Sequence, residues 1–145
     1  MSTLVVVLLI GLGAGALIGL QNPLASLLGS RLGLLEGSFL THLGGTLFAG
    51  LLLLLLGGGG FSGWREVPWY GFLAGVVGVG IIASVAYTVP RIGVTSAVTL
   101  MVTGQLLVGA IIDHFGWLGV TVNPLTPARG LGFGVLLLGT WLIVR

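Results

Sequence analysis

The run GLQNPLASLLGS, residues 19 to 30, places Gln21, Asn22 and Pro23 side by side in an apolar stretch. Gln21 lies ten residues before Arg31, which is about 15 Å along a helix and so near the middle of a bilayer. Pro23 has no N–H, and its ring opposes the carbonyl of Gly19, so a helix should kink there and leave an acceptor free. The run therefore predicts part of a binding site for a polar solute.

Polar stripes follow at helical spacing in three later segments. They comprise Ser38, Thr41, His42, Gly45 and Thr46, then Ser84, Tyr87, Thr88 and Arg91, and then Thr95, Thr99 and Thr103, with Gln105 on a neighbouring face. Residues three or four apart share one face of a helix, so four helices could enclose one polar cleft. The substrate-binding residues predicted in this way are Gln21, Asn22, His42, Thr46, Ser84, Tyr87, Arg91, Thr99, Thr103 and Gln105, with Pro23 and Pro90 as hinges.

Each polar residue also has a purely structural explanation. Buried serines and threonines often donate to the carbonyl four residues earlier, and a glutamine between helices can serve as glue. His42 is the titratable residue well inside a predicted helix, and ionisable residues there are functional candidates by default. A neutral histidine satisfied by a threonine is the alternative.

Composition places these stripes in a membrane. The chain has 145 residues, of which 56% are hydrophobic and 6% charged, far from the average of a soluble domain. A net charge of +2, carried by five scattered arginines, does not suggest a nucleic-acid surface. The absence of cysteine excludes disulfides and a thiol nucleophile.

Five segments are long and apolar enough to span a bilayer, which needs about 20 residues. They are residues 3–29, 36–57, 68–90, 92–113 and 127–145, and together they predict one five-helix transmembrane domain over residues 1–145. Pro90 should end the third span just before Arg91. Pro68 and Pro127 should lie in the first turns of the third and fifth. Glycines recur four apart at Gly11, Gly15 and Gly19, at Gly71 and Gly75, and at Gly130 and Gly134, a spacing that predicts close helix packing.

No catalytic or metal-binding constellation accompanies the stripes. The acidic residues Glu36, Glu66 and Asp113 lie at span ends, and the sequence has no G-x-S-x-G, H-E-x-x-H or P-loop motif. Asp113 and His114 are interpreted as an interfacial anchor pair, because two ligands without a third make a weak metal site. We therefore expect no enzyme activity, no metal and no cofactor.

The arginines are evenly divided between the two sides of the membrane. Five spans put Arg65 and Arg129 on one side and Arg31, Arg91 and Arg145 on the other, so the positive-inside rule has little excess to act on. Such a chain is expected to insert both ways and to pair as an antiparallel homodimer, an inverted repeat of the kind used by secondary transporters. The alternative is that the weak bias suffices for one orientation.

Four stretches carry a family resemblance over nearly the whole chain. They are GLQNPLASLLGSRLG, SFLTHLGGTL, VPRIGVTSAVTLMVTGQLLVGAIIDHFGWLG and PLTPARGLGFGVLLLG. With these motifs the chain resembles the YdcZ-like family of small bacterial inner-membrane proteins in the drug/metabolite transporter superfamily. The resemblance implies five spans, dual-topology homodimers or fused ten-span chains, and a transport role. It brings no assigned binding residues.

The predicted function is a secondary transporter of the inner membrane. An antiparallel homodimer would move a small polar or amphipathic metabolite or drug by alternating access, with membrane lipid and the solute as its other partners. Two alternatives stay open: a small dual-topology channel in which Arg91 selects an anion, and a helper subunit without flux of its own. The absence of a carboxylate within the spans favours a neutral or anionic solute over a cation.

Overall fold

The computed structural model describes residues 3–58 and 60–145, and its regular structure over these residues is helical. The chain divides into two compact units, residues 1–91 and 92–145. The first unit contains α1 (Thr3–Leu32), α2 (Leu34–Leu56), the short 3-10 segments η1 (Gly60–Glu66) and η2 (Trp69–Phe72), and the first part of α3 (Leu73–Phe115). The second contains the rest of α3, η3 (Trp117–Gly119) and α4 (Pro127–Val144).

Helix α3 accounts for two of the five predicted spans. Its 43 residues measure about 65 Å at 1.5 Å per residue, more than twice the hydrocarbon thickness. The helix is interrupted at Gly93, where φ is 78° and ψ is 164°. Four helices of the described chain are long and apolar enough to cross a membrane. Because α3 is interrupted at Gly93, it corresponds to two of the five predicted spans.

The prediction that Pro90 ends the third span was wrong by a few residues. Pro90 lies inside α3, and the break falls at Gly93, because a positive φ is open to glycine and strained for other residues. The prediction for Pro68 was also wrong, since Pro68 precedes the 3-10 segment η2 and the α-helix begins only at Leu73. The prediction for Pro127 is confirmed: it opens α4, where the Thr126 hydroxyl accepts from the Arg129 N–H at 3.3 Å.

Helices α1 and α2 form a tight hairpin through Gly33, whose φ of 115° permits the reversal. At the base of the hairpin the two backbones nearly touch. A Cβ built on Gly37 would lie 2.6 Å from the backbone nitrogen of Gly29. Side chains at these positions would push the helices apart.

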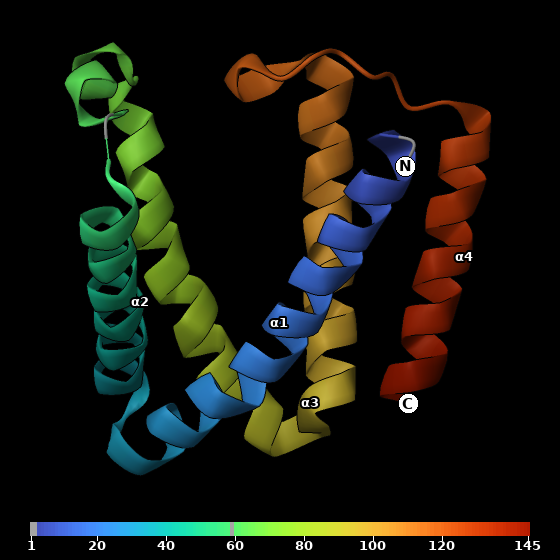
Figure 1. The fold of residues 1–145 in the computed structure, drawn as a ribbon. Coiled ribbons are helices and arrows are strands. Elements are labelled where there is room, and N and C mark those ends of the chain that lie inside the picture. Colours follow the sequence, from blue (N-terminus) through green and yellow to red (C-terminus); the bar gives the residue numbers. More distant parts are fainter. Residues whose placement is uncertain (1–2, 59) are drawn as a thin grey trace. The chain divides into compact units, whose positions relative to one another are not determined.

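The core of the first unit lies where α3 packs against the hairpin. The buried residues of α1 are Asn22, Ala25, Ser26 and Gly29, and those of α3 are Ile82, Val85, Ala86 and Val89. Both sets follow an i, i+3, i+4, i+7 spacing, so each forms one helix face. The Cβ of Ala86 occupies the place that a side chain on Gly29 would need. In Figure 1, α2 runs alongside the first part of α3, in the opposite direction.

Most glycines of the predicted stripes do not pack within their own units, contrary to the prediction; the exception is Gly71, where a built Cβ would lie 3.1 Å from Cγ1 of Val67. A Cβ built on Gly11, Gly15 or Gly19 would meet no described atom within 4 Å, and the same holds for Gly75, Gly130 and Gly134. Spacing alone does not say which face of a helix meets a neighbour, and the close contacts fall on Gly29 and Gly37 instead.

Hydroxyl groups join α3 to α4 in the second unit. Thr103 and Thr140 are both buried, and their hydroxyl oxygens lie 2.6 Å apart. The Ser96 hydroxyl donates to the carbonyl of Ile143 at 3.5 Å.

Large apolar side chains such as Leu54 and Leu131, 85% and 75% exposed, cover the outer surfaces. Hydrocarbon accepts such surfaces at no cost, whereas water does not.

Candidate functional site

Ser38 is the polar centre of the first unit. It lies one turn into α2 and is completely buried. Its hydroxyl donates to the backbone carbonyl of Val79 in α3 at 3.2 Å. This bond fixes the register of α2 against the first part of α3, and so determines which residues of the two helices face each other one turn further on.

His42 is placed by the same turn of α2. Its Nδ1 lies 2.8 Å from the carbonyl oxygen of Ser38. A carbonyl can only accept, so Nδ1 carries the hydrogen, and in the neutral ring Nε2 keeps a lone pair. Nε2 lies against Gly78 of α3, where a built Cβ would be only 2.7 Å away. The absence of a side chain at residue 78 therefore makes room for the imidazole.

An open groove of about 490 Å³ lies beside His42 within the first unit. It is lined by residues of α1, α2 and the first part of α3: Gln21, Thr41, His42, Gly45, Thr46, Ala49, Gly78, Ile81 and Ile82. Hydrogen-bonding groups come from α1 and α2, whereas α3 contributes a glycine and two isoleucines. None of these lining residues carries a fixed charge. Such a surface suits a small amphipathic molecule.

The groove brings together three of the predicted site residues: Gln21, His42 and Thr46. Thr41, which belongs to the same predicted stripe, donates to the carbonyl of Gly37 at 2.8 Å and presents its oxygen as an acceptor only. His42 lies eight residues into α2, about 12 Å from the start of the helix, within the depth of a bilayer core.

Asn22 points elsewhere, although it is next to Gln21 in sequence. It is 6% exposed and belongs to the face of α1 that also contains Ala25, Ser26 and Gly29. Adjacent residues on a helix are about 100° apart around its axis, so the side-chain amides of Gln21 and Asn22 lie on different faces of α1. Helix α1 runs from Thr3 to Leu32 as one helix with Pro23 inside it, and a hinge at Pro23 stays a prediction.

The polar stripe at the end of the first unit is mostly satisfied within its own helix. Ser84 and Thr88 donate to the carbonyls of Gly80 and Ser84, both four residues earlier. Arg91 donates to the carbonyl of Tyr87, and its guanidinium carbon lies 3.6 Å from the centre of the Tyr87 ring. Ser84, Tyr87 and Arg91 do not line the groove described above. The local explanation of these hydroxyls fits what is observed.

The stripe of the second unit takes part in helix packing. Thr99 donates to the carbonyl of Thr95, and Thr103 to that of Thr99, each at 2.8 Å. Thr103 also pairs with Thr140, so its hydroxyl is used twice. Gln105 is exposed. Thr140 was not among the predicted site residues, and it is this residue that pairs with Thr103.

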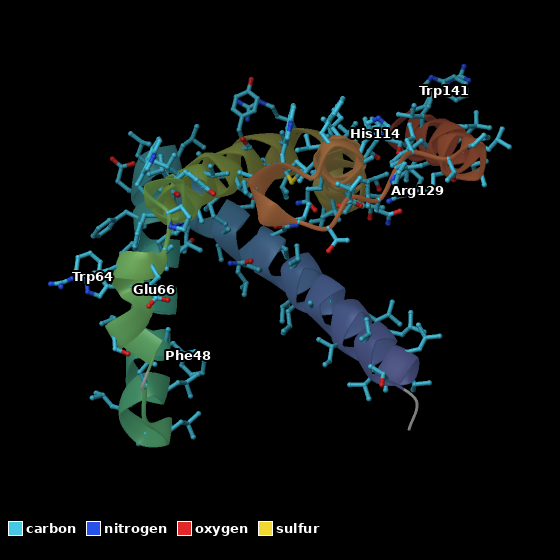
Figure 2. The ribbon with its side chains drawn as sticks, turned by 90° about the horizontal axis from the view of Figure 1, so that it is seen from above. Phe48, Trp64, Glu66, His114, Arg129 and Trp141 are labelled. Carbon is cyan, nitrogen blue, oxygen red and sulfur yellow. The ribbon has the colours of Figure 1, made fainter. Side chains whose placement is uncertain are left out.

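Asp113 and His114 form contacts that hold the connection between α3 and α4. Asp113 forms an ion pair of 3.1 Å with Arg129, which also donates to the carbonyl of Asn123. His114 accepts the backbone N–H of Leu125 at its Nδ1. Figure 2 labels His114 and Arg129 in this region, where α3 ends and α4 begins. Among residues 3–58 and 60–145 no cluster of three potential metal ligands occurs.

Sequence reasoning missed the α3 side of the groove. Gly78 decides where the His42 ring can lie, and Ile81 and Ile82 supply the apolar wall. The sequence did contain a signal for this wall of the groove, because Gly75 and Gly78 share a helix face with Ile82 by the i, i+3, i+7 spacing. Small residues on that face permit a neighbour to approach closely.

Comparison with known families covers almost the whole chain. The family model described as "Putative inner membrane exporter, YdcZ" matches residues 6–142. No curated protein and no solved structure matches the chain.

Proposed function

We propose that this chain, which belongs to the YdcZ family of inner-membrane exporters, exports a small neutral amphipathic solute that binds in the groove lined by Gln21, His42 and Thr46. The chain is a multi-pass inner-membrane protein, and its family is one of exporters and not of enzymes. The observation that carries the proposal is the groove itself. It combines three polar side chains that carry no fixed charge with an apolar wall, at a depth where hydrogen-bonding groups are costly to leave unused.

The neutral solute class follows from the chemistry of the lining. A carboxylate is the usual partner of a buried cation, and the acidic residues Glu36, Glu66 and Asp113 are not among the lining residues. Gln21 can donate and accept, the Thr46 hydroxyl can do both, and Ile81 and Ile82 can hold an apolar body. The volume of about 490 Å³ falls in the range of roughly 300 to 1,000 Å³ that small-molecule pockets have.

Alternating access in an antiparallel homodimer is the mechanism that we propose. A single groove in one unit gives no pathway through the membrane, whereas two oppositely oriented copies would supply one such groove for each side. The near-equal distribution of the five arginines and the odd number of spans support this arrangement.

The anion channel has less support. Its proposed selectivity residue, Arg91, is engaged by the ring and the carbonyl of Tyr87 one turn earlier on its own helix. The groove contains no arginine. No observation favours a channel over a carrier.

The test is export from intact cells. Metabolites are profiled by mass spectrometry in the medium and the cytoplasm of cells that produce the wild type, Gln21→Ala or Ser30→Ala. Ser30 is the matched control, since it is on the same helix, is exposed and donates only to the carbonyl of Leu27. The wild type and Ser30→Ala should enrich the same neutral solutes in the medium, and Gln21→Ala should reduce this at least tenfold at equal protein level. Equal export by Gln21→Ala, or no enrichment by the wild type, would refute the proposal.

A further inference from the structure

Asn22 and Ser26 are polar side chains of α1 that are buried without a hydrogen bond to any described residue. Each is 6% exposed, and the two lie one turn apart on the face of α1 that packs inside the first unit. Thr41 and Ser84, by contrast, donate to carbonyls of their own helices. Asn22 lies nine residues before Arg31, about 14 Å along the helix, at a depth where hydrocarbon offers no partner. Both groups therefore need a partner that the described part of the chain does not supply.

The polar atoms of Asn22 and Ser26 are within reach of a water-sized molecule. Among the described residues that are not exposed, every side-chain nitrogen or oxygen sealed from the surface has a hydrogen-bond partner. Since the amide of Asn22 and the hydroxyl of Ser26 have no partner, their atoms are not sealed, and each borders a narrow opening beside α1. A molecule as small as water can therefore touch them without displacing a helix.

A third unsatisfied group, the carbonyl of Gly19, lies on the same face of α1. In an α-helix this carbonyl accepts from the N–H four residues later, and that residue is Pro23, which has no N–H. Gly19 precedes Asn22 by three residues and Ser26 by seven, which places them on one face. Helical side chains lean toward the N-terminal turn, so the Ser26 hydroxyl leans toward Asn22 and the Asn22 amide toward Gly19. A Cβ built on Gly19 would meet no described atom within 4 Å, so the space beside it is open.

We infer that Asn22, Ser26 and the carbonyl of Gly19 hold a water molecule on this face of α1, and that Pro23 and this water form a hydrated joint about which residues 3–18 move. A buried water makes about three hydrogen bonds to groups that would otherwise have none. Water accepts from the Asn22 amide and the Ser26 hydroxyl and donates to the Gly19 carbonyl. A cation would pair with the oxygens alone and leave the amide hydrogens of Asn22 without an acceptor.

The joint lies where the packing of α1 changes. Residues 3–18 are exposed, whereas the buried residues of α1 begin at Asn22. Pro23 lies at this boundary and removes one hydrogen bond of the helix. Ordered water is one of the groups that satisfy the backbone at a proline inside a membrane helix, and a helix bends where water inserts. The inference deepens the proposed alternating access and rests on it for the role of this movement in export.

The water is tested by ¹⁵N-edited NMR of labelled protein in nanodiscs of deuterated lipid. The chain has two asparagines, Asn22 and Asn123, so Asn123→Ser leaves one asparagine side-chain amide and assigns it to Asn22. That amide should show a cross-peak to water. The backbone amide of Val85, a completely buried residue of α3, is the dry control and should show none. Absence of the cross-peak at Asn22 would overturn the inference.

Two serines of α1 supply a matched pair of variants. Ser26→Ala removes one of the groups that hold the water and should weaken the water cross-peak of Asn22 at least twofold. Ser30→Ala is the control, because Ser30 is exposed one turn later and donates to the carbonyl of Leu27. Its cross-peak at Asn22 should equal that of the wild type. An equal cross-peak in the two variants would overturn the assignment of the water to this face.

The movement is tested by distance measurements between spin labels, since the chain has no native cysteine. Leu8→Cys and Leu40→Cys place labels at exposed positions of α1 and α2, in labelled chain diluted with unlabelled chain. The distance distribution should be broad, and Pro23→Ala, which restores the missing N–H, should narrow it at least twofold. The control pair Leu27→Cys and Leu40→Cys, on the packed part of the hairpin, should be narrow with and without Pro23→Ala. An unchanged width for the Leu8 pair would overturn the joint.

Export separates this inference from the proposed function. Pro23 and Ser26 are not among the residues that line the groove, so their effect on export has to come through the joint. Pro23→Ala and Ser26→Ala should each lower export at least threefold without changing which solutes are exported. Unchanged export in both variants would overturn the role of the joint in transport. If the water and the movement are observed while the wild type exports nothing, the proposed function fails and the hydrated joint stands.

Discussion

The backbones of Gly29 in α1 and Gly37 in α2 are in contact, and a Cβ on Gly37 would lie 2.6 Å from the nitrogen and 2.7 Å from the Cα of Gly29. Main-chain atoms cannot turn aside as a side chain can, so a substitution here has to move a helix. The same Gly29 lies under Ala86 of α3. Three helices thus meet at small residues, and the groove next to His42 depends on the angle at which they diverge.

This contact predicts that Gly37→Ala destabilises the protein in detergent by about 1 to 3 kcal/mol, the usual cost of overpacking. The matched control is Gly44→Ala, seven residues later on α2, where a built Cβ meets no described atom within 4 Å. Alanine is the better helix former, so the control should be neutral or up to about 1 kcal/mol more stable. Thermal unfolding of both variants measures the difference. A Gly37→Ala protein as stable as the control would contradict the packing at Gly29.

The buried hydroxyl pair of Thr103 and Thr140 predicts an energetic coupling between α3 and α4. Valine at either position removes the 2.6 Å contact with little change of shape. Interhelical hydrogen bonds in membranes contribute about 0.6 kcal/mol on average and up to about 1.7 kcal/mol. A double-mutant cycle with Thr103→Val and Thr140→Val should give a coupling in that range.

The control for this cycle pairs Thr99→Val with Thr140→Val. Thr99 donates to the carbonyl of Thr95 on its own helix, whereas the partner of Thr140 is Thr103, so the coupling between Thr99 and Thr140 should be close to zero. Equal coupling in the two cycles would contradict the assignment of Thr103 to helix packing.

The boundaries of the predicted spans and of the observed helices show how much of the fold could be predicted. The first, second and fifth spans were predicted at residues 3–29, 36–57 and 127–145, and the helices run over Thr3–Leu32, Leu34–Leu56 and Pro127–Val144. These boundaries depend on local causes, namely the length of apolar runs and the signals at their ends. The break at Gly93 was missed because Pro90 is the stronger local signal, whereas the helix continued past Pro90 to the glycine that can adopt a positive φ.

The candidate site could be predicted only in part. Periodicity shows which residues share one face of a helix, but not which other helix that face contacts. Gln21, His42 and Thr46 line one groove, while Asn22 lies in a packed face and Thr103 pairs with Thr140. Which glycines pack is decided by how each helix is rotated toward the next, and among 28 glycines no local pattern selects Gly29 and Gly37. The binding role of the polar residues stays a prediction.

The ion pair between Asp113 and Arg129 predicts a local effect and not a global one. Both side chains are about one third exposed, and pairs of this kind contribute at most about 1 kcal/mol. Arg129 also holds the carbonyl of Asn123, so Arg129→Gln should loosen residues 120–126. Hydrogen exchange should increase at the amides of Asn123 and Leu125, while the thermal midpoint changes little. Asp113→Asn removes only the ion pair and should change exchange less. Equal exchange in Arg129→Gln and the wild type would contradict the role of Arg129 in holding residues 120–126.

The balanced arginines predict that orientation can be shifted by small changes in charge. Two lysines added in the connection of residues 60–67 should place that side in the cytoplasm for nearly all chains, because lysine and arginine in short loops determine orientation. Reporters on both termini, active on only one side of the membrane, measure the two populations. The wild type should show both, and the variant one. If antiparallel pairs are required, export should be lost in the variant and return when a partner chain carries two lysines at Ser30 and Leu34 instead. Loss without such rescue, or a single orientation of the wild type, would contradict the antiparallel homodimer.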